Sequence, residues 1–280
     1  MASLADRPTV GAVAPDDLLR YQKAFESLPA YRQAMNAVTV TPIGKVAVNR
    51  RTAARVSNTF SVHLPENPAT SQKSSGRCWL FAALNTLRTS AQKSMNLAPG
   101  FELSQNYPLF WDKFEKANYF LENILATLDE PVGSRLLDWL LVAPIQDGGQ
   151  WDMFVNLVQK YGVVPKAVMP ETESSSSTGA MSGAITGKLR EYACRLRSAH
   201  QAGADETALR ETKDQQLAEV YRMLCIHLGE PPTSFRWAWR DQEKQYHDEG
   251  LVTPLEFYRA HVGVELSDSV CLIHDPRPGH

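Results

Sequence analysis

The chain has 280 residues and 43% of them are hydrophobic, which is enough for one large domain or two small ones without support from disulfides or metals. Its 29 basic and 31 acidic residues give a formal net charge of −2, so no strong field indicates binding to nucleic acid or to an anionic membrane. The four cysteines lie far apart and form no CxxC pair, which argues against a disulfide framework and a zinc site; they are Cys78, Cys194, Cys225 and Cys271.

The first part of the chain predicts a tail followed by two helical segments. Residues 1–16 are expected to be a flexible tail. They do not resemble a signal peptide, because acidic residues and prolines stand where a signal peptide needs an apolar core. Residues 17–37 have helical character that Pro29 interrupts, and residues 38–60 favour irregular or short extended structure. No apolar run approaches membrane-spanning length, so we expect a cytosolic protein without a membrane partner.

Residues 78–95 predict a largely buried helix. The run contains neither Gly nor Pro, and its apolar residues recur at helical spacing. Gly76 precedes it and Pro99-Gly100 follows it, so Cys78 is expected in the first turn of the helix.

Further elements are predicted by the same criteria. We expect helices after Ser104, over 117–128, 134–142, 151–161, 188–198 and 206–228, a strand over 234–241, a capping box from Thr253 to Glu256, and an extended apolar segment from Ser269 onward. The serine-rich stretch 171–183 is expected to be a mobile surface loop, and Cys194, Cys225 and Cys271 to be buried or half-buried thiols.

Cys78 is the main candidate for chemistry. At a helix start, the helix dipole and free backbone N–H groups favour the thiolate, which is the nucleophilic form of cysteine. Gln72 lies six residues upstream in a polar loop, from which its amide can reach the Cys78 N–H. Two donors directed at one point would form an oxyanion hole for acyl transfer.

The strings around these residues resemble a known family. Ser75-Gly76-Arg77-Cys78-Trp79 partly matches the signature of the papain-type nucleophile, and "QKSSGRCW" followed by "FAALN" resembles the bleomycin hydrolase and aminopeptidase C branch of the papain-like cysteine peptidases. The likeness continues through "DGGQWDMFVNLVQKYGVVPK", "LGEPPTSFRWAWRD" and "HDPRPGH", and covers residues 58–280.

The resemblance implies an α+β, papain-like fold, mostly its helical lobe with helical insertions. The implied divisions are an N-terminal extension (1–57), a helical catalytic lobe (58–170), a helical insertion (171–262) and the start of a β-barrel lobe that is otherwise largely absent (263–280). It implies that Cys78 and Gln72 are catalytic, that Gly148 and Gly149 with Trp79 bind peptide substrate, that no metal or other cofactor is needed, and that the protein is a homo-oligomer, a hexamer in the family. Ser75 replaces a cysteine that forms a disulfide in secreted relatives, in agreement with a cytosolic location.

The family's catalytic His and Asn are not recognised in this sequence. The chain has no N-S-W-G string, and none of its seven histidines has the family context. We therefore expect the amino-terminal part of a thiol aminopeptidase, inactive by itself. Two alternatives stay open: a truncated non-catalytic module for oligomerisation or regulation, and another transferase with a cysteine nucleophile.

Overall fold

The computed structural model describes residues 13–57, 59–62, 67–270 and 272. The chain divides into two compact units, Met1–His63 and Leu64–His280. The expected tail lies mostly outside the described residues, as do Cys271 and most of the expected extended segment after Ser269.

The first unit consists of helices that bury no side chains. Its elements are α1 (Pro15–Glu26), α2 (Pro29–Val38), α3 (Ile43–Val46) and α4 (Arg50–Ala53). Pro29 is the first residue of α2, which confirms the predicted interruption. Residues 38–60 contain two single-turn helices in place of the extended structure considered above, and the Asn49 side chain caps the second by accepting the Thr52 N–H at 3.1 Å.

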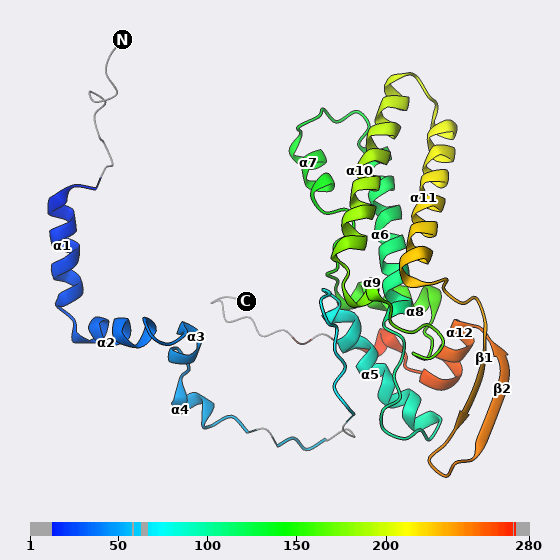
Figure 1. Ribbon diagram of the computed structural model, residues 1–280, viewed down its shortest axis with the longest axis horizontal. Helices are drawn as coiled ribbons and strands as arrows, with labels where there is room; N and C mark the ends of the chain where they lie inside the picture. Colours follow the sequence, from blue (N-terminus) through cyan, green and yellow to red (C-terminus); the bar gives the residue numbers. More distant parts are fainter. Residues whose placement is uncertain (1–12, 58, 63–66, 271, 273–280) are drawn as a thin grey trace. The chain divides into compact units, whose positions relative to one another are not determined.

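The second unit is built around long helices (Figure 1). Its elements are α5 (Cys78–Ser94), α6 (Asn106–Ala126), α7 (Arg135–Val142), α8 (Trp151–Tyr161), α9 (Glu173–Ser176), α10 (Gly179–Gln201), α11 (Glu206–Leu228), β1 (Phe235–Arg240), β2 (Tyr246–Val252) and α12 (Pro254–Phe257), followed by a π-helical turn (Tyr258–Val262) and a 3-10 turn (Leu266–Asp268). The predicted α+β class with a mostly helical lobe is confirmed, since two paired strands accompany these helices.

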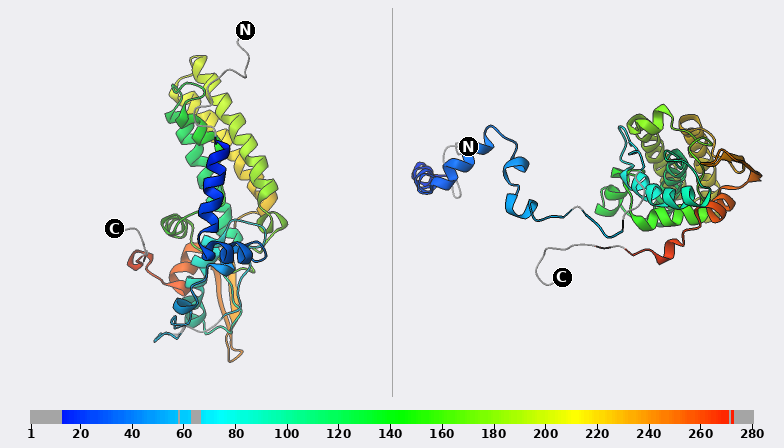
Figure 2. Two further views of the ribbon diagram at one scale, coloured as in Figure 1. Left: turned by 90° about the vertical axis from the view of Figure 1, so that its left-hand side faces the viewer. Right: turned by 90° about the horizontal axis from the view of Figure 1, so that it is seen from below.

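Helices α6, α10 and α11 pack side by side, as two further views in Figure 2 also show. Phe110 and Phe114 of α6 meet Tyr221 of α11 edge to face, with ring centroids 5.3 and 5.6 Å apart. The helix expected after Ser104 and the one expected over 117–128 are one, because no Gly or Pro separates Phe114 from Ala117 and Ala117 continues the buried face. This single α6 spans the bundle and carries the charged groups discussed below.

Helix α8 is tied to α6 on one side and to α12 on the other. Trp111 of α6 stacks on Tyr161 with centroids 4.0 Å apart. Gly162 ends α8 at φ +74, and a Cβ there would lie 2.4 Å from the backbone of Pro254. Only glycine allows both the left-handed turn and this close approach, so Gly162 fixes α8 against α12.

The serine-rich stretch is ordered, contrary to the expectation of a mobile loop. Thr172 and Ser175 form a capping box that starts α9, and the Ser175 side chain is fully buried. The Ser176 carbonyl accepts the Ser74 N–H at 2.9 Å. The hydroxyl groups that made the segment look like a surface loop are used as caps.

The strand predicted over 234–241 is confirmed as β1, and its partner β2 was not predicted. The two pair antiparallel from Phe235↔Val252 to Arg240↔Tyr246, with a bulge after Trp237. No β2 residue is fully buried, and Asp248, Glu249 and Gly250 interrupt its apolar residues, so no alternation of apolar residues indicates the strand. Among the helices within the described ranges, none combines the length and hydrophobicity needed to cross a bilayer.

Candidate active site

Cys78 is the first residue of α5 and is exposed to solvent. The Arg77 carbonyl accepts the Phe81 N–H at 3.0 Å and so opens the helix. Arg77 provides no side-chain cap for the first turn, whose amides remain available to a negatively charged group. The predicted placement of Cys78 at a helix start is confirmed.

Arg77 holds the loop before the cysteine from inside the protein. Its side chain is fully buried and forms a bidentate pair with Glu171 at 3.0 and 2.7 Å. Its Nε donates to the Ser75 hydroxyl at 2.9 Å, and its guanidinium lies over the Phe81 ring. In this chain, Ser75 therefore connects the cysteine loop to a buried ion pair.

Gln72 lies at the other end of this loop and is half-buried. Its backbone carbonyl accepts the Ser75 hydroxyl at 2.6 Å, while the Ser74 N–H bonds to Ser176. Within the described ranges its side-chain amide has no hydrogen-bond partner. The structure thus gives the Gln72–Cys78 loop a fixed path and leaves the Gln72 amide unengaged.

Asp147 joins the cysteine loop to the bundle. Its Oδ2 accepts the Gly76 N–H at 2.9 Å and the Thr178 hydroxyl at 2.5 Å, and its Oδ1 accepts from Lys113 at 2.5 Å. Burial by itself would raise the pKa of Asp147, but these hydrogen bonds outweigh it and lower the pKa to about 2. The Asp147 carboxylate therefore anchors the loop at Gly76, two residues before the cysteine.

The predicted contact region around Gly149 is compact. The Trp79 indole Nε1 donates to the Asp147 carbonyl at 2.8 Å. A Cβ on Gly149 would lie 2.5 Å from the Trp79 ring, so any larger residue would collide with it. The structure brings these two candidate residues together. Position 149 requires a glycine because the Trp79 indole leaves no space for a side chain.

The two glycines differ in what their backbones offer. The Gly148 carbonyl accepts Lys116 Nζ at 2.8 Å, whereas Gly149 has no hydrogen-bond partner for either backbone group within the described ranges. A cavity of about 330 Å³ opens beside Gly149, lined by Trp79, Ala82, Ala83, Thr86, Gly149, Gln150, Trp151 and Phe154. An extended peptide could therefore pair with Gly149 and place an apolar side chain in this cavity.

The four described histidines are engaged elsewhere. His200 pairs with Asp129 at 3.0 Å, His227 with Ser174 at 2.9 Å, and His247 with Asp241 and His261 with Glu249 each at 2.8 Å. None of these partners belongs to the cysteine loop. His63, His274 and His280 lie outside the described residues.

The other thiols differ from Cys78 in environment. Cys225 is half-buried as expected, and burial raises the pKa of its thiol. The expectation for Cys194 is wrong: its side chain is exposed on α10, because its neighbour Ala193 occupies the buried face. Cys271 lies outside the described residues.

Several residues that shape the site were not predicted: Arg77, Lys113, Lys116, Asp147, Glu171 and Thr178. For Lys113 the sequence held a signal, because it follows Phe110 by three residues and precedes Ala117 by four, on the buried face of α6. A lysine on an apolar face needs a buried partner. For Arg77 and Glu171, separated by 94 residues, no local pattern indicates the pairing.

Comparison with known proteins agrees with this geometry. The sequence profile of the peptidase C1-like family matches residues 12–280. The chain is 42% identical over 262 residues to human bleomycin hydrolase, covering 91% of this chain and 57% of the relative. It is 41% identical over 248 residues to aminopeptidase C of Lactobacillus delbrueckii subsp. lactis, covering 89% and 55%.

A further relative and one solved structure give the same result. Rabbit bleomycin hydrolase is 40% identical over 258 residues, with 90% of this chain and 93% of the relative covered. The crystal structure of PepW from Lactobacillus rhamnosis HN001 has a TM-score of 0.86 and 43% identity, covering 93% of this chain and 58% of that one. The chain thus spans a little over half the length of the human and bacterial relatives.

Proposed function

Because the chain belongs to the peptidase C1-like family, we propose that it acts as a cysteine aminopeptidase of the bleomycin hydrolase type, with Cys78 as nucleophile and peptides as substrates. The observation that carries the proposal is the exposed Cys78 at the uncapped start of α5, next to Trp79 packed on Gly149. The backbone of Gly149, which can pair with a peptide, thus lies against the residue that follows Cys78, and the loop before Cys78 has a fixed path.

The mechanism follows from this arrangement. The Cys78 thiolate attacks the scissile carbonyl carbon, and the developing oxyanion is held by the Cys78 N–H and the Gln72 side-chain amide. The amine leaves with a proton from a general acid, and water then hydrolyses the thioester. Gly149 offers both backbone groups to the substrate and Gly148 its N–H, while Trp79 forms a wall of the site.

The first test is the reactivity of the thiols. Iodoacetamide is expected to label Cys78 faster than Cys194, Cys225 or Cys271 near neutral pH, because among the three cysteines that the structure describes only Cys78 combines exposure with a helix start. Labelling rates over a pH series, read by peptide mapping, give the comparison. Equal labelling of Cys194, which is also exposed, would refute the assignment.

We further propose that the 280-residue chain by itself turns over amide substrates very slowly. Each described histidine is bonded to a partner away from Cys78, so the described residues provide no imidazole to protonate a leaving amine. Aminoacyl-coumarin release should match that of C78A. Release above this control would show that one of the remaining histidines acts as the acid.

A second candidate role is assembly with further copies of the chain, as a homo-oligomer or as a non-catalytic regulatory module. In its favour, α1 and α2 bury no residue and expose Leu18, Leu19, Phe25 and Tyr31. Sedimentation velocity of the chain with and without residues 1–57 tests this role. The same number of subunits in both forms would dismiss it. The free thiols Cys78, Cys194 and Cys225 support a cytosolic location.

A further inference from the structure

Two lysines one turn apart on α6 hold the segment that leads into Gly149. Lys113 Nζ donates to the Ile145 carbonyl at 2.7 Å and to the Asp147 carboxylate at 2.5 Å. Lys116 Nζ donates to the carbonyls of Gln146 and Gly148, both at 2.8 Å. The four residues 145–148 are thus each bonded to one of two ammonium groups.

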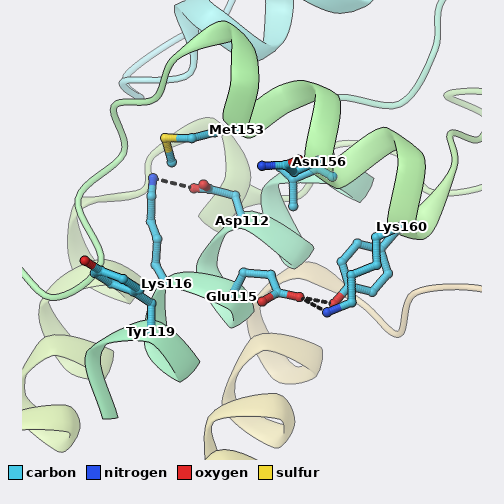
Figure 3. Close-up of a pocket in the computed structure, with 9 residues that line it drawn as sticks. Asp112, Glu115, Lys116, Tyr119, Met153, Asn156 and Lys160 are labelled. Atoms are coloured by element: carbon cyan, nitrogen blue, oxygen red, sulfur yellow. Dashed lines mark hydrogen bonds and ion pairs between the residues drawn. The ribbon is translucent and has the colours of Figure 1, made fainter. Parts of the chain in front are cut away.

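Lys116 uses its full hydrogen-bonding capacity in this arrangement. Its third donor goes to the Asp112 carboxylate at 2.9 Å, so three N–H groups meet three acceptors. Figure 3 shows this pair beside Met153, in a cavity of about 560 Å³ between α6 and α8. The ammonium also lies 5.5 Å from the centre of the Trp79 ring, which itself contacts Gly149.

The charged groups of Lys113, Lys116 and Asp112 are largely shielded from water, which strengthens the bonds of the two lysines to residues 145–148. The side chain of Lys113 is fully buried, that of Asp112 is 2% exposed and that of Lys116 is 13% exposed. Burial raises the pKa of Asp112 to about 6, against the opposing effect of Lys116 and Lys113. Hydrogen bonds from a charged donor in such surroundings are stronger than bonds between neutral groups.

We propose that Lys116, supported by Lys113 and Asp112, is a positioning residue that fixes the backbone of residues 145–149 and thereby sets the affinity of the site for the peptide backbone of the substrate. The Gly148 carbonyl is turned toward α6 and held there, while neither backbone group of Gly149 bonds to any residue that the structure describes. Lys116 itself does not contact the substrate. This inference rests on the proposed peptide site at Cys78 and Gly149.

The test separates peptide recognition from thiol reactivity. Cys78 is alkylated by a dipeptidyl chloromethyl ketone with a free amino terminus, whose methylene carbon forms a bond to sulfur as chloride leaves, and separately by iodoacetamide, which has no peptide to recognise. The concentration of peptidyl reagent that gives half the maximal alkylation rate (KI) measures its binding. K116M is expected to raise this KI about tenfold, the effect of losing one charged hydrogen bond, while the rate with iodoacetamide stays the same.

Two further variants make the result specific. Lys160 lines the same cavity as Lys116, but it pairs with Glu115 at 2.5 Å and has no bond to residues 145–149. The KI of K160M should therefore equal that of the unaltered chain. The double variant D112N/K116M leaves no unpaired buried carboxylate, which protects the fold, and should repeat the KI of K116M.

The outcomes are distinct. An unchanged KI in K116M or in D112N/K116M, an equal increase in K160M, or a parallel loss of the iodoacetamide rate would overturn the positioning role. A peptidyl reagent that shows no saturation with the unaltered chain would overturn the proposed peptide site, and this inference with it.

Discussion

Replacing Gln72 by alanine is expected to slow the acylation of Cys78 by an activated ester by about two to three orders of magnitude, the usual effect of losing one oxyanion donor. The Gln72 side-chain amide is unengaged in the described structure, and the loop that carries it is tied at Ser74, Ser75 and Gly76. The substitution therefore removes a donor without breaking a bond that holds the loop. Acylation should fall while substrate binding changes little.

The choice of reagents isolates the oxyanion. A p-nitrophenyl ester of an amino acid carries a leaving group that needs no general acid. The size and rate of the p-nitrophenolate burst therefore measure the acylation step by itself. Iodoacetamide alkylates the same thiol at a saturated carbon and forms no oxyanion, so its rate should be equal in Q72A and the unaltered chain. Q159A, on the exposed face of α8, is the matched control. If Q72A acylates as fast as Q159A, Gln72 is not an oxyanion donor.

Replacing Arg77 by methionine is expected to lower the free energy of unfolding by about 3–5 kcal/mol, since it leaves Glu171 without its partner in a buried ion pair. Arg77 is 0% exposed and bonds to Glu171 through two nitrogens and to Ser75 through the third. Methionine fills much of the same space, so loss of the pairing, rather than a cavity, accounts for most of the expected change.

Urea unfolding followed by circular dichroism measures the effect. The double variant R77M/E171Q should recover part of the loss, because it leaves no carboxylate uncompensated. R236M breaks an exposed pair with Asp248 and should leave the urea midpoint unchanged. A midpoint for R77M equal to that of R236M would show that the Arg77–Glu171 pair does not hold the cysteine loop.

The sequence was most informative where local signals act. Helix α5 begins at Cys78 and α8 ends at Gly162 as expected, because uninterrupted apolar spacing and a glycine stop are local properties. The capping box at Thr253 was also predicted, and Thr253 and Glu256 bond reciprocally. Each of these signals spans only a few residues.

The errors arose where a distant partner decides the structure. Residues 172–178 are typical of a loop until distant partners bond to them: the Ser176 carbonyl accepts the Ser74 N–H, and the Thr178 hydroxyl donates to Asp147. The β2 strand is held by its pairing with β1 and has no alternating apolar pattern of its own. For the candidate site, the nucleophile was predicted from its helix start, but the supporting charges Arg77 and Asp147 were not, since their partners lie on other elements.

The bonds of Asp147 also constrain the order in which the molecule can form. They connect residues separated by 71, 34 and 31 positions along the chain, and contacts of such length carry the entropy cost of closing long loops. The backbone hydrogen bonds within helices α5 and α6 are local, so these helices can form earlier. We therefore expect the loop before Cys78 to acquire its final path late in folding, after α6 and the start of α10 have come together, so that a nascent chain carries a cysteine without a finished site around it.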